Sequence, residues 1–456
     1  MNQFTFESKQ KTVLMAFMAL GVVCLGLSWV FDDPAYHHAR FWTNFLHNAT
    51  FFTGIALMTL FFISASVTAW AGWYTVFKRV WESFTAFLVP GFVLMLVIIA
   101  GLWLGWHEIY HWADTEEVAK DRILSGKASF LNKNWYTFGT IIIMAIWILF
   151  ARRIRQLSLE EEKSGGADYK FHHKTRVWAA AFLPIAGFSS AALIWQWIMS
   201  VDSHWYSTLY AWYSGASWFV AAMALTILLL IYLKSLGYFE NVTAEHFHDL
   251  GKFLFAFSIF WTYLWFSQFM LIWYANNGEE TIYFHQRMQD YPVLFYGNLV
   301  INFMLPFLIL MRNDTKRKNG TMVLAAVLVF VGHWMDFFLM IKPGALITAQ
   351  HAAHAAAEHG AEGHGEAAGH GAEHAAEMVE HASEFVAGFS IPGLLEIGVM
   401  LGFLALFLYV VLNNLTKAPL QPANDPYIDE SLHHHVGYGG GPIHHHGHGA
   451  EAEHGH

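Results

Sequence analysis

Ten apolar runs of about 20 residues recur along this chain of 456 residues, and they constrain its fold more than any other feature. A helix of that length crosses the hydrocarbon core of a bilayer, whereas a lone strand cannot satisfy its backbone hydrogen bonds in lipid. The composition agrees with this, because 55% of the residues are hydrophobic and only 13% are charged. The sequence therefore predicts an all-α polytopic membrane protein.

The predicted spans divide the chain into a membrane domain and two interruptions. The apolar runs predict spans at residues 12–31, 47–70, 82–106, 135–151, 177–200, 211–233, 252–275, 292–311, 320–341 and 391–412. The domains that follow are a membrane domain at 1–341, a His/Ala/Gly-rich loop at 342–390, the tenth span at 391–412 and a His-rich tail at 413–456. We interpret the first run as a retained span, because it is longer than the apolar core of a signal peptide. The tail is predicted to be disordered.

The distribution of basic residues predicts the orientation. With the N-terminus in the cytoplasm, 18 of the 25 lysines and arginines fall on the cytoplasmic side. Segments 151–156 and 312–320 carry most of this bias. We therefore expect both termini in the cytoplasm and the loop at 342–390 on the outer side.

Two histidine-rich tracts interrupt the apolar pattern. Residues 351–383 and 433–456 together hold 16 of the 28 histidines. Metal buffering is one interpretation of such tracts. The favoured one is a solvated, poorly ordered insertion, because Ala, Gly, Glu and His cannot bury enough apolar surface to order the chain.

Polar residues gather where spans end on the predicted outer side. Such groups are costly at membrane depth, so they face the protein interior and often mark proton or substrate paths. The candidates for lining a proton-accessible cavity are His107, Glu108, His111, Asp114, Asp202, His204, Gln268 and Glu280. If the third span continues as helix, His107, His111 and Asp114 lie on one of its faces. Histidine titrates near neutral pH and a nearby carboxylate can take a second proton, so we expect this cluster to release protons.

Spans nine and ten carry a second set of ionisable residues. His333 and Asp336 are one turn apart, and His333 lies roughly 20 Å from the inner end of its span. Glu396 enters from the outside and reaches about 8 Å. A charge in lipid costs a few kcal/mol, so we expect the three to share a cavity that serves as a proton path. The alternative for each residue is a satisfied polar contact between helices.

The stretch HEIYH at 107–111 matches the H-E-x-x-H zinc motif. A catalytic zinc needs a third protein ligand, which intramembrane metalloproteases take from an Asp in an Asn-Pro-Asp-Gly-like or Leu-Asp-Gly stretch. Here Asp202 lies in VDSHW and Asp336 lies in WMDFF. An intramembrane metalloprotease is thus a minor alternative, and no metal site is predicted.

Haem and iron–sulfur cofactors are not expected on this chain either. Five histidines could be ligands for haem, but no two spans show the repeated spacing that two stacked haems require; they are His47, His107, His111, His204 and His333. The single Cys24 excludes an iron–sulfur site within the chain. We predict no covalently bound cofactor.

Three stretches resemble a known family. They are SVDSHWYSTLYAWYSGAS at 200–217, HDLGKFLFAFSIFWTYLWFSQFMLIWYANNGEE at 248–280 and HEIYHWAD at 107–114. They look like the ActF-type membrane subunit of alternative complex III, a bacterial quinol:cytochrome c or quinol:oxidase oxidoreductase. This subunit belongs to the wider polysulfide-reductase/NrfD-like membrane family. The resemblance covers about residues 10–340 and the last span.

The resemblance implies a fold and a set of partners. The fold is two four-helix bundles, each with a polar cavity, plus peripheral helices in a bacterial inner membrane. The partners are a similar membrane subunit that oxidises quinol, an iron–sulfur subunit, multihaem and monohaem cytochrome c subunits, small membrane subunits and a terminal oxidase. Haems and Fe–S clusters belong to those partners, while this subunit contributes a cavity for quinol or menaquinol, a proton path or both, and is not expected to catalyse alone.

Two other functional classes remain open. An ion- or proton-coupled secondary transporter also has buried acids, but it usually shows inverted repeats and helices broken by Gly or Pro. We find no internal repeat, and prolines inside spans are few: Pro90, Pro184 and Pro306. A structural scaffold would need no buried ionisable groups. Nucleic acid is not an expected partner, because the net charge is -10 and no basic patch occurs.

Overall fold

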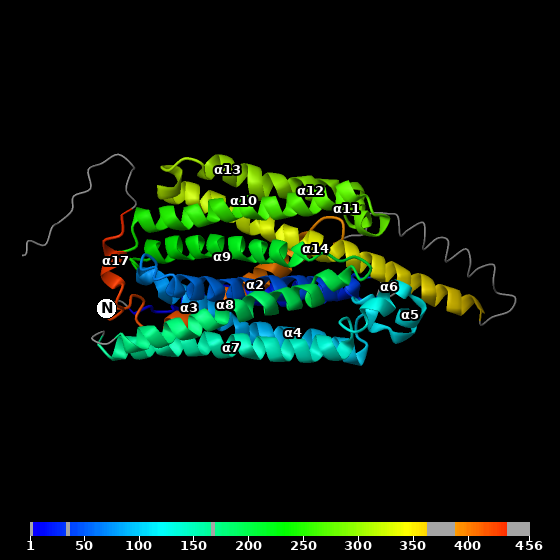
Figure 1. Ribbon diagram of the computed structural model, residues 1–456, viewed down its shortest axis with the longest axis horizontal. Coiled ribbons are helices and arrows are strands. Elements are labelled where there is room, and N and C mark those ends of the chain that lie inside the picture. The colour runs from blue at the N-terminus through cyan, green and yellow to red at the C-terminus, as the bar shows by residue number, and fades with distance from the viewer. Residues whose placement is uncertain (1–2, 33–36, 166–168, 363–387, 436–456) are drawn as a thin grey trace, which may run out of the picture.

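The structure is a computed structural model that describes residues 3–32, 37–165, 169–362 and 388–435. Within these ranges ten helices are long and apolar enough to cross a membrane, and the only β-pairing is one isolated bridge between Gln3 and Pro419. The helices lie side by side along the long axis of the molecule (Figure 1). The prediction of an all-α polytopic membrane protein is confirmed.

Eight spans are single helices and two are composite. The single helices are α1 (Ser8–Val30), α2 (Ala39–Thr68), α7 (Lys133–Lys163), α8 (Lys170–Trp197), α9 (Leu209–Ser235), α10 (Ala244–Ala275), α14 (Asn319–Glu362) and α16 (Leu394–Leu415). The third span joins α3 (Lys78–Phe84) through a 3₁₀ turn to α4 (Leu88–Leu104). The eighth joins α12 (Pro292–Leu299) through a π-helical segment, Val300–Met304, to α13 (Leu305–Leu310). Four short helices lie outside the spans: α5 (Thr115–Lys120), α6 (Arg122–Lys127), α11 (Gly278–Asp290) and α17 (Ile428–Leu432).

The two ends of the helix array differ in what covers them. We call the end that holds the N-terminal residues and α17 the tail end, and the end that holds α5, α6 and α11 the head end (Figure 1). At the tail end Gln3 Nε2 donates a hydrogen bond of 2.7 Å to the carbonyl of Thr416. The first described residue and the end of the tenth span therefore meet at one end, as an even number of spans requires. That the tail end faces the cytoplasm stays a prediction from loop charge.

Eight of the ten spans form two four-helix bundles. In the first bundle α2, the α3–α4 span, α7 and α8 pack in a ring. In the second bundle α9, α10, the α12–α13 span and α14 do the same. Helices α2 and α9 are buried along most of their length because they lie where the bundles meet. This is the two-bundle architecture that the resemblance implies.

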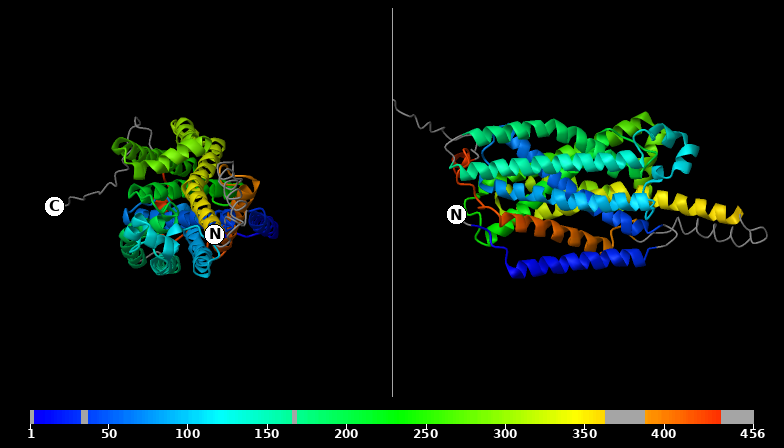
Figure 2. Two further views of the ribbon diagram at one scale, coloured as in Figure 1. Left: turned by 90° about the vertical axis from the view of Figure 1, so that its right-hand side faces the viewer. Right: turned by 90° about the horizontal axis from the view of Figure 1, so that it is seen from below.

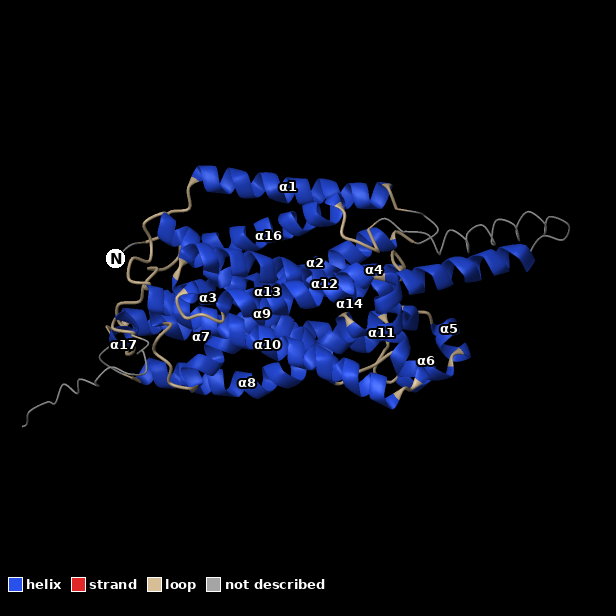
Figure 3. Ribbon diagram, turned by 90° about the horizontal axis from the view of Figure 1, so that it is seen from above, coloured by secondary structure: helices blue, strands red, loops and turns tan. Residues whose placement is uncertain are grey.

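The remaining spans, α1 and α16, pack together at the edge of the molecule (Figures 2 and 3). Their backbones touch, because a Cβ added to Gly21 would lie only 2.6 Å from the Cα of Gly402. The other side of α1 exposes apolar side chains such as Val22 and Val30. In a bilayer this face contacts lipid, so α1 and α16 are the peripheral helices.

The predicted boundary at residue 341 is wrong. Helix α14 continues through Pro343 to Glu362, so the loop predicted at 342–390 begins inside a helix. Alanine, the best helix former, recurs in HAAHAAAEHGAE at 351–362 and supports the extension. Residues 363–387, which hold the rest of the first His-rich tract, lie outside the described residues.

The prediction of a disordered tail at 413–456 is wrong for its first half. Residues 413–415 complete α16, and residues 416–435 lie across the tail end, where Ser431 is fully buried. The buried polar contacts that hold this segment, including Lys78 with Asp425, give no apolar signal in the sequence. Residues 436–456 lie outside the described residues.

The prediction that HEIYH continues the third span as helix is also wrong. Helix α4 ends at Leu104, and Gly105 follows with a positive φ of 68°. Glycine in the left-handed region is the usual helix stop, because a Cβ there is strained. Residues 106–110 have no regular structure, so His107, His111 and Asp114 do not share a helical face.

Candidate functional site

The second bundle encloses a carboxylate, Asp336 of α14, that is fully buried. Its oxygen Oδ1 accepts hydrogen bonds from the Tyr213 hydroxyl and, at 2.7 Å, from Asn298 Nδ2. Its oxygen Oδ2 accepts hydrogen bonds of 3.0 Å each from Ser217 Oγ and Trp261 Nε1. Three other spans of the bundle supply these donors: α9, α10 and the α12–α13 span. The site is therefore built by the bundle as a whole.

All four donors to Asp336 are neutral. Among the described residues no lysine, arginine or histidine lies within ion-pair distance of this carboxylate. A carboxylate in hydrocarbon is costly, and here only hydrogen bonds offset that cost. Because no cation is paired with it, Asp336 can gain a proton without leaving an opposite charge unpaired. This is the chemical property that a proton carrier needs.

His333 lies next to Asp336, as the spacing of one turn predicts. Its Nδ1 is 2.8 Å from Ser217 Oγ, the same hydroxyl that donates to Asp336. Its Nε2 is buried and has no hydrogen-bond partner in the described residues. Ser217 thus bridges the imidazole and the carboxylate, and a proton moving between them would need only a short relay.

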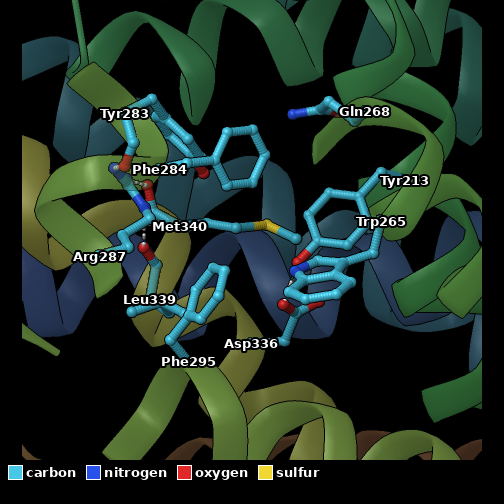
Figure 4. A pocket seen from close by; sticks show the side chains of 10 residues that line it. All are labelled: Tyr213, Trp265, Gln268, Tyr283, Phe284, Arg287, Phe295, Asp336, Leu339 and Met340. Carbon is cyan, nitrogen blue, oxygen red and sulfur yellow. Dashed lines mark hydrogen bonds between the residues drawn. The ribbon is translucent and has the colours of Figure 1, made fainter. Parts of the chain in front are cut away.

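A narrow cavity adjoins Asp336 (Figure 4). Aromatic and polar side chains line it, and Gln268 on α10 points toward it with its Oε1 unpaired. The volume that the centre of a water molecule can occupy is about 20 Å³, enough for one or two water molecules. Gln268, one of the candidates from the sequence, therefore faces this cavity, and its role in carrying protons stays a prediction.

Arg287 of α11 closes the head-end side of this cavity. Its Nη2 donates 2.7 Å to Asp202 Oδ2, and its guanidinium carbon lies 3.3 Å from the centre of the Tyr283 ring. Burial lowers the pKa of Arg287, but Tyr283 and Asp202 outweigh burial and raise it, so the residue stays a cation. Asp202 is among the residues predicted from the sequence, whereas Arg287 is not.

A second, wider cavity opens at the head end beyond Arg287. Tyr283 lines both cavities, while Asp202, His111, His204 and Thr348 line only the wider one. Its space open to water centres is about 170 Å³. His204 Nε2 lies 2.6 Å from Asp121 Oδ2 at its rim. The two cavities share Tyr283, and between them lies the ion pair of Arg287, which lines the narrow cavity, and Asp202, which lines the wide one.

Glu396 does not join this route, so the prediction that it shares a cavity with His333 and Asp336 is wrong. It pairs with Arg40, whose Nε lies 2.8 Å from Glu396 Oε1, and it accepts a bond from Asn44. The reason is topological, since α16 packs on α1 and α2 rather than on α14. Arg40 was counted as a loop residue because the apolar run of the second span starts only at 47.

The remaining predicted residues are spread over the head end. His107 is buried, its Nε2 is 3.0 Å from the carbonyl of Ile98, and burial lowers its pKa to about 4. It is neutral at pH 7, so the expectation that it titrates near neutrality is wrong. Glu108 faces His37 at 3.5 Å on the surface, and Asp114 accepts the amide of Glu116 at 2.8 Å.

Glu280 also lies away from the cavities. Its backbone carbonyl, and not its carboxylate, accepts a bond of 3.1 Å from Trp205 Nε1. Of the predicted residues, Gln268 and Asp336 line the narrow cavity and His333 reaches Asp336 through Ser217, whereas Asp202, His111 and His204 line the wide head-end cavity.

HEIYH does not have the geometry of a zinc protease site. That motif requires two histidines on adjacent turns of one helix, whereas here the stretch leaves the helix before His107. His107 faces the Trp42 ring and His111 faces the His204 ring. In the part of the chain that the structure describes, no three His, Cys, Asp or Glu residues are grouped to hold a metal ion.

The structure also buries ionisable side chains that were not predicted from the sequence: Lys342, and a set of ion pairs at the tail end. Lys342 of α14 is fully buried, and its Nζ donates 2.8 Å to Thr43 Oγ1. It was missed because the ninth span was predicted to end at 341. The second group is a set of ion pairs at the tail end of the first bundle, where Lys78 and Glu161 were assigned to loops.

Comparison with known proteins adds no family assignment. A scan against protein-family models finds no match to this chain, and a search of curated proteins finds none.

Proposed function

We propose that this chain conducts protons through the head-end half of the membrane, as a membrane subunit of a respiratory quinol:cytochrome c or quinol:oxidase oxidoreductase. The assembly and its bacterial inner membrane are proposed on the resemblance of residues 107–114, 200–217 and 248–280 to the alternative complex III subunit. The proton role is proposed on the site itself. The observation that carries it is a fully buried carboxylate, Asp336, held by four neutral donors beside a water-sized cavity.

The proposed route passes its groups in a definite order. Water in the wide cavity reaches Asp202 and Tyr283, and the narrow cavity continues from Tyr283 to Asp336. Beyond Asp336, Ser217 leads to His333. The cation Arg287 at the junction disfavours a free hydronium ion there, so a proton must pass by way of a group that neutralises it. Asp202 is that group.

Size favours protons over quinol in the narrow cavity. Ligand pockets for organic molecules have volumes on the order of 300–1,000 Å³, whereas the space beside Asp336 admits only one or two waters. A quinol headgroup would require Trp265 and Phe295 to move apart. We therefore assign quinol oxidation to the similar partner subunit that the resemblance implies.

An ion-coupled transporter is the second candidate, and one observation favours it. The π-helical segment Val300–Met304 interrupts the eighth span and contains Asn302, whose Nδ2 donates a hydrogen bond to Asn298 Oδ1 one turn earlier. Interrupted helices are typical of ion sites in transporters, and π-segments often mark functional sites. If Na⁺ stimulates transport by the wild type, and this stimulation is lost in Asn302→Leu, the result would favour the transporter.

The test of the proton role is the substitution Asp336→Asn. Asparagine keeps the shape and can still accept bonds, but it cannot carry the proton. We expect the assembled complex in proteoliposomes to lose about tenfold or more of its proton release, with at most a modest loss of stability. Glu280→Gln, which removes a head-end carboxylate outside the cavities, is the matched control and should release protons like the wild type. Full proton release by an assembled Asp336→Asn variant would end the proposal.

A further inference from the structure

The first bundle has its own buried ionisable cluster, at the end opposite to Asp336. Lys78 of α3 pairs with Asp425 and lies 3.7 Å from Glu161 of α7. Glu161 in turn lies 3.5 Å from His172 of α8. Beside this chain of contacts, Arg79 pairs with Glu82 at 2.8 Å. We call these residues the tail-end cluster.

A small cavity lies within the tail-end cluster. Lys78, Glu82, Glu161 and His172 line it from the bundle, and its space open to water centres is about 20 Å³. Two further lining residues, Asp425 and Tyr427, belong to the segment that follows the last span. The bundle alone therefore does not complete this cavity, because one wall comes from residues 416–435.

Residues 416–435, which we call the strap, are anchored to the first bundle by polar contacts. Ala423 N donates to both carboxylate oxygens of Glu162 at 3.1 Å, and Asn424 Nδ2 donates 2.7 Å to the Glu162 carbonyl. The amide of Gly72 donates 3.1 Å to Glu430 Oε1. These contacts place the strap over the ends of α3 and α7.

The strap also reaches the second bundle. His246 Nε2 lies 3.1 Å from the carbonyl of Ser431, and His434 Nε2 lies 2.7 Å from Asp249 Oδ2. Both partners are in the first turns of α10, so a single segment bridges the two bundles. Figure 1 shows α17, the helical part of the strap, lying across the tail end.

The way in which the strap is held suggests that it can leave. Its contacts with the bundles are mainly hydrogen bonds and ion pairs, which water can replace, and its one regular element is the five-residue α17. Its buried apolar side chains are Ala418, Leu420 and Pro422. Segments with few apolar contacts open at low free energy, without unfolding of the rest of the protein.

We propose that the strap is a lid that closes the tail-end cavity of the first bundle, with Asp425 as its latch on Lys78, and that its release opens the cluster to water. This inference does not depend on the proton role of Asp336, which lies in the other bundle. It assigns the strap a gating role at the tail end.

The test labels introduced thiols in a chain whose single native cysteine, Cys24, has been replaced. In a Cys24→Ser background, Thr175→Cys places a thiol in the tail-end cavity, where Thr175 is buried and bonds only the Phe171 carbonyl. Thr348→Cys places a matched thiol in the wide head-end cavity, where Thr348 likewise bonds only the Gly344 carbonyl. A hydrophilic maleimide then reports the access of each thiol in the purified, detergent-solubilised chain.

Release of the strap should expose one thiol and not the other. In a chain that ends at Thr416, we expect alkylation of Cys at 175 to rise about tenfold or more and alkylation of Cys at 348 to stay unchanged. The full-length double variant Asp425→Ala, Ser431→Ala removes two buried polar side chains that hold the strap and should give an increase in the same direction. If the shortened chain does not accumulate in cells, the test relies on this double variant. Unchanged reactivity at 175 in either folded variant would overturn the lid, as would an equal rise at 348, which indicates general loosening.

Discussion

The two bundles bury charge in opposite ways. In the tail-end cluster of the first bundle every carboxylate lies near a cation or a histidine, as Asp425 lies beside Lys78. In the second bundle Asp336 has only neutral donors. Protonating a paired carboxylate leaves its cation unpaired in a low dielectric, whereas protonating Asp336 leaves no such charge. The first arrangement suits a fixed structure and the second suits proton exchange.

The largest effect is expected from the substitution Lys78→Met. This change removes the cation that serves both Asp425 and Glu161, and it leaves two buried carboxylates without it. Removal of one partner from a buried ion pair costs about 3–5 kcal/mol. We expect a large fall in thermal stability and in the yield of folded chain, measured in detergent.

The double variant Lys78→Met, Asp425→Leu is the control for this prediction. It removes both charges of the closest pair, so it should recover part of the lost stability. An unchanged melting temperature in Lys78→Met would contradict the view that Lys78 stabilises the tail-end cluster.

The sequence alone predicts the part of this comparison that depends on local spacing. The ten spans follow from the lengths of apolar runs, and His333 with Asp336 follows from the helical period. Glu161 and Lys78 could not be placed, because the polar ends of α7 and α3 look like loops until the strap covers them. Their burial is a tertiary effect.

Burial by tertiary packing, which the sequence does not show, also explains the wrong predictions at the head end. Arg287 lies in a short polar helix outside the spans, and only packing under Tyr283 buries it. The partner of Glu396 was missed because α2 begins at Ala39, before its apolar run. Gly105 is the one local signal in the sequence that could have corrected the helix predicted through HEIYH.

Asp202→Asn tests the junction between the two head-end cavities. The variant leaves Arg287 as a buried cation without its carboxylate partner, although the carbonyls of Tyr283 and Leu339 still accept its bonds. We expect a stability loss of about 1–3 kcal/mol and a clear fall in proton release, because Asp202 is the neutralising group at Arg287. A variant with lower stability but normal proton release would restrict Asp202 to a structural role.

Tyr213→Phe tests one of the hydrogen bonds to Asp336. It removes one of the four donors and leaves the ring in place against Trp261. The expected cost is about 1 kcal/mol, with a several-fold slower proton release if the hydroxyl relays protons. Equal rates in wild type and variant, measured with a pH dye in proteoliposomes, would exclude Tyr213 from the relay.

The smallest effect is expected from Glu108→Gln. Glu108 and His37 are each about half exposed and 3.5 Å apart, and surface pairs of this kind contribute about 0–1 kcal/mol. Neither thermal stability nor proton release should change measurably. A marked loss of proton release would return HEIYH to the proton path and widen the site beyond the second bundle.

Infrared difference spectroscopy of the purified chain across a pH titration tests most directly whether Asp336 exchanges a proton while Asp425 does not. We predict a protonated carboxyl band that appears on acidification, shifts in D₂O, is absent in Asp336→Asn and is retained in Asp425→Asn. A band that persists in Asp336→Asn, or one that disappears only in Asp425→Asn, would contradict the account.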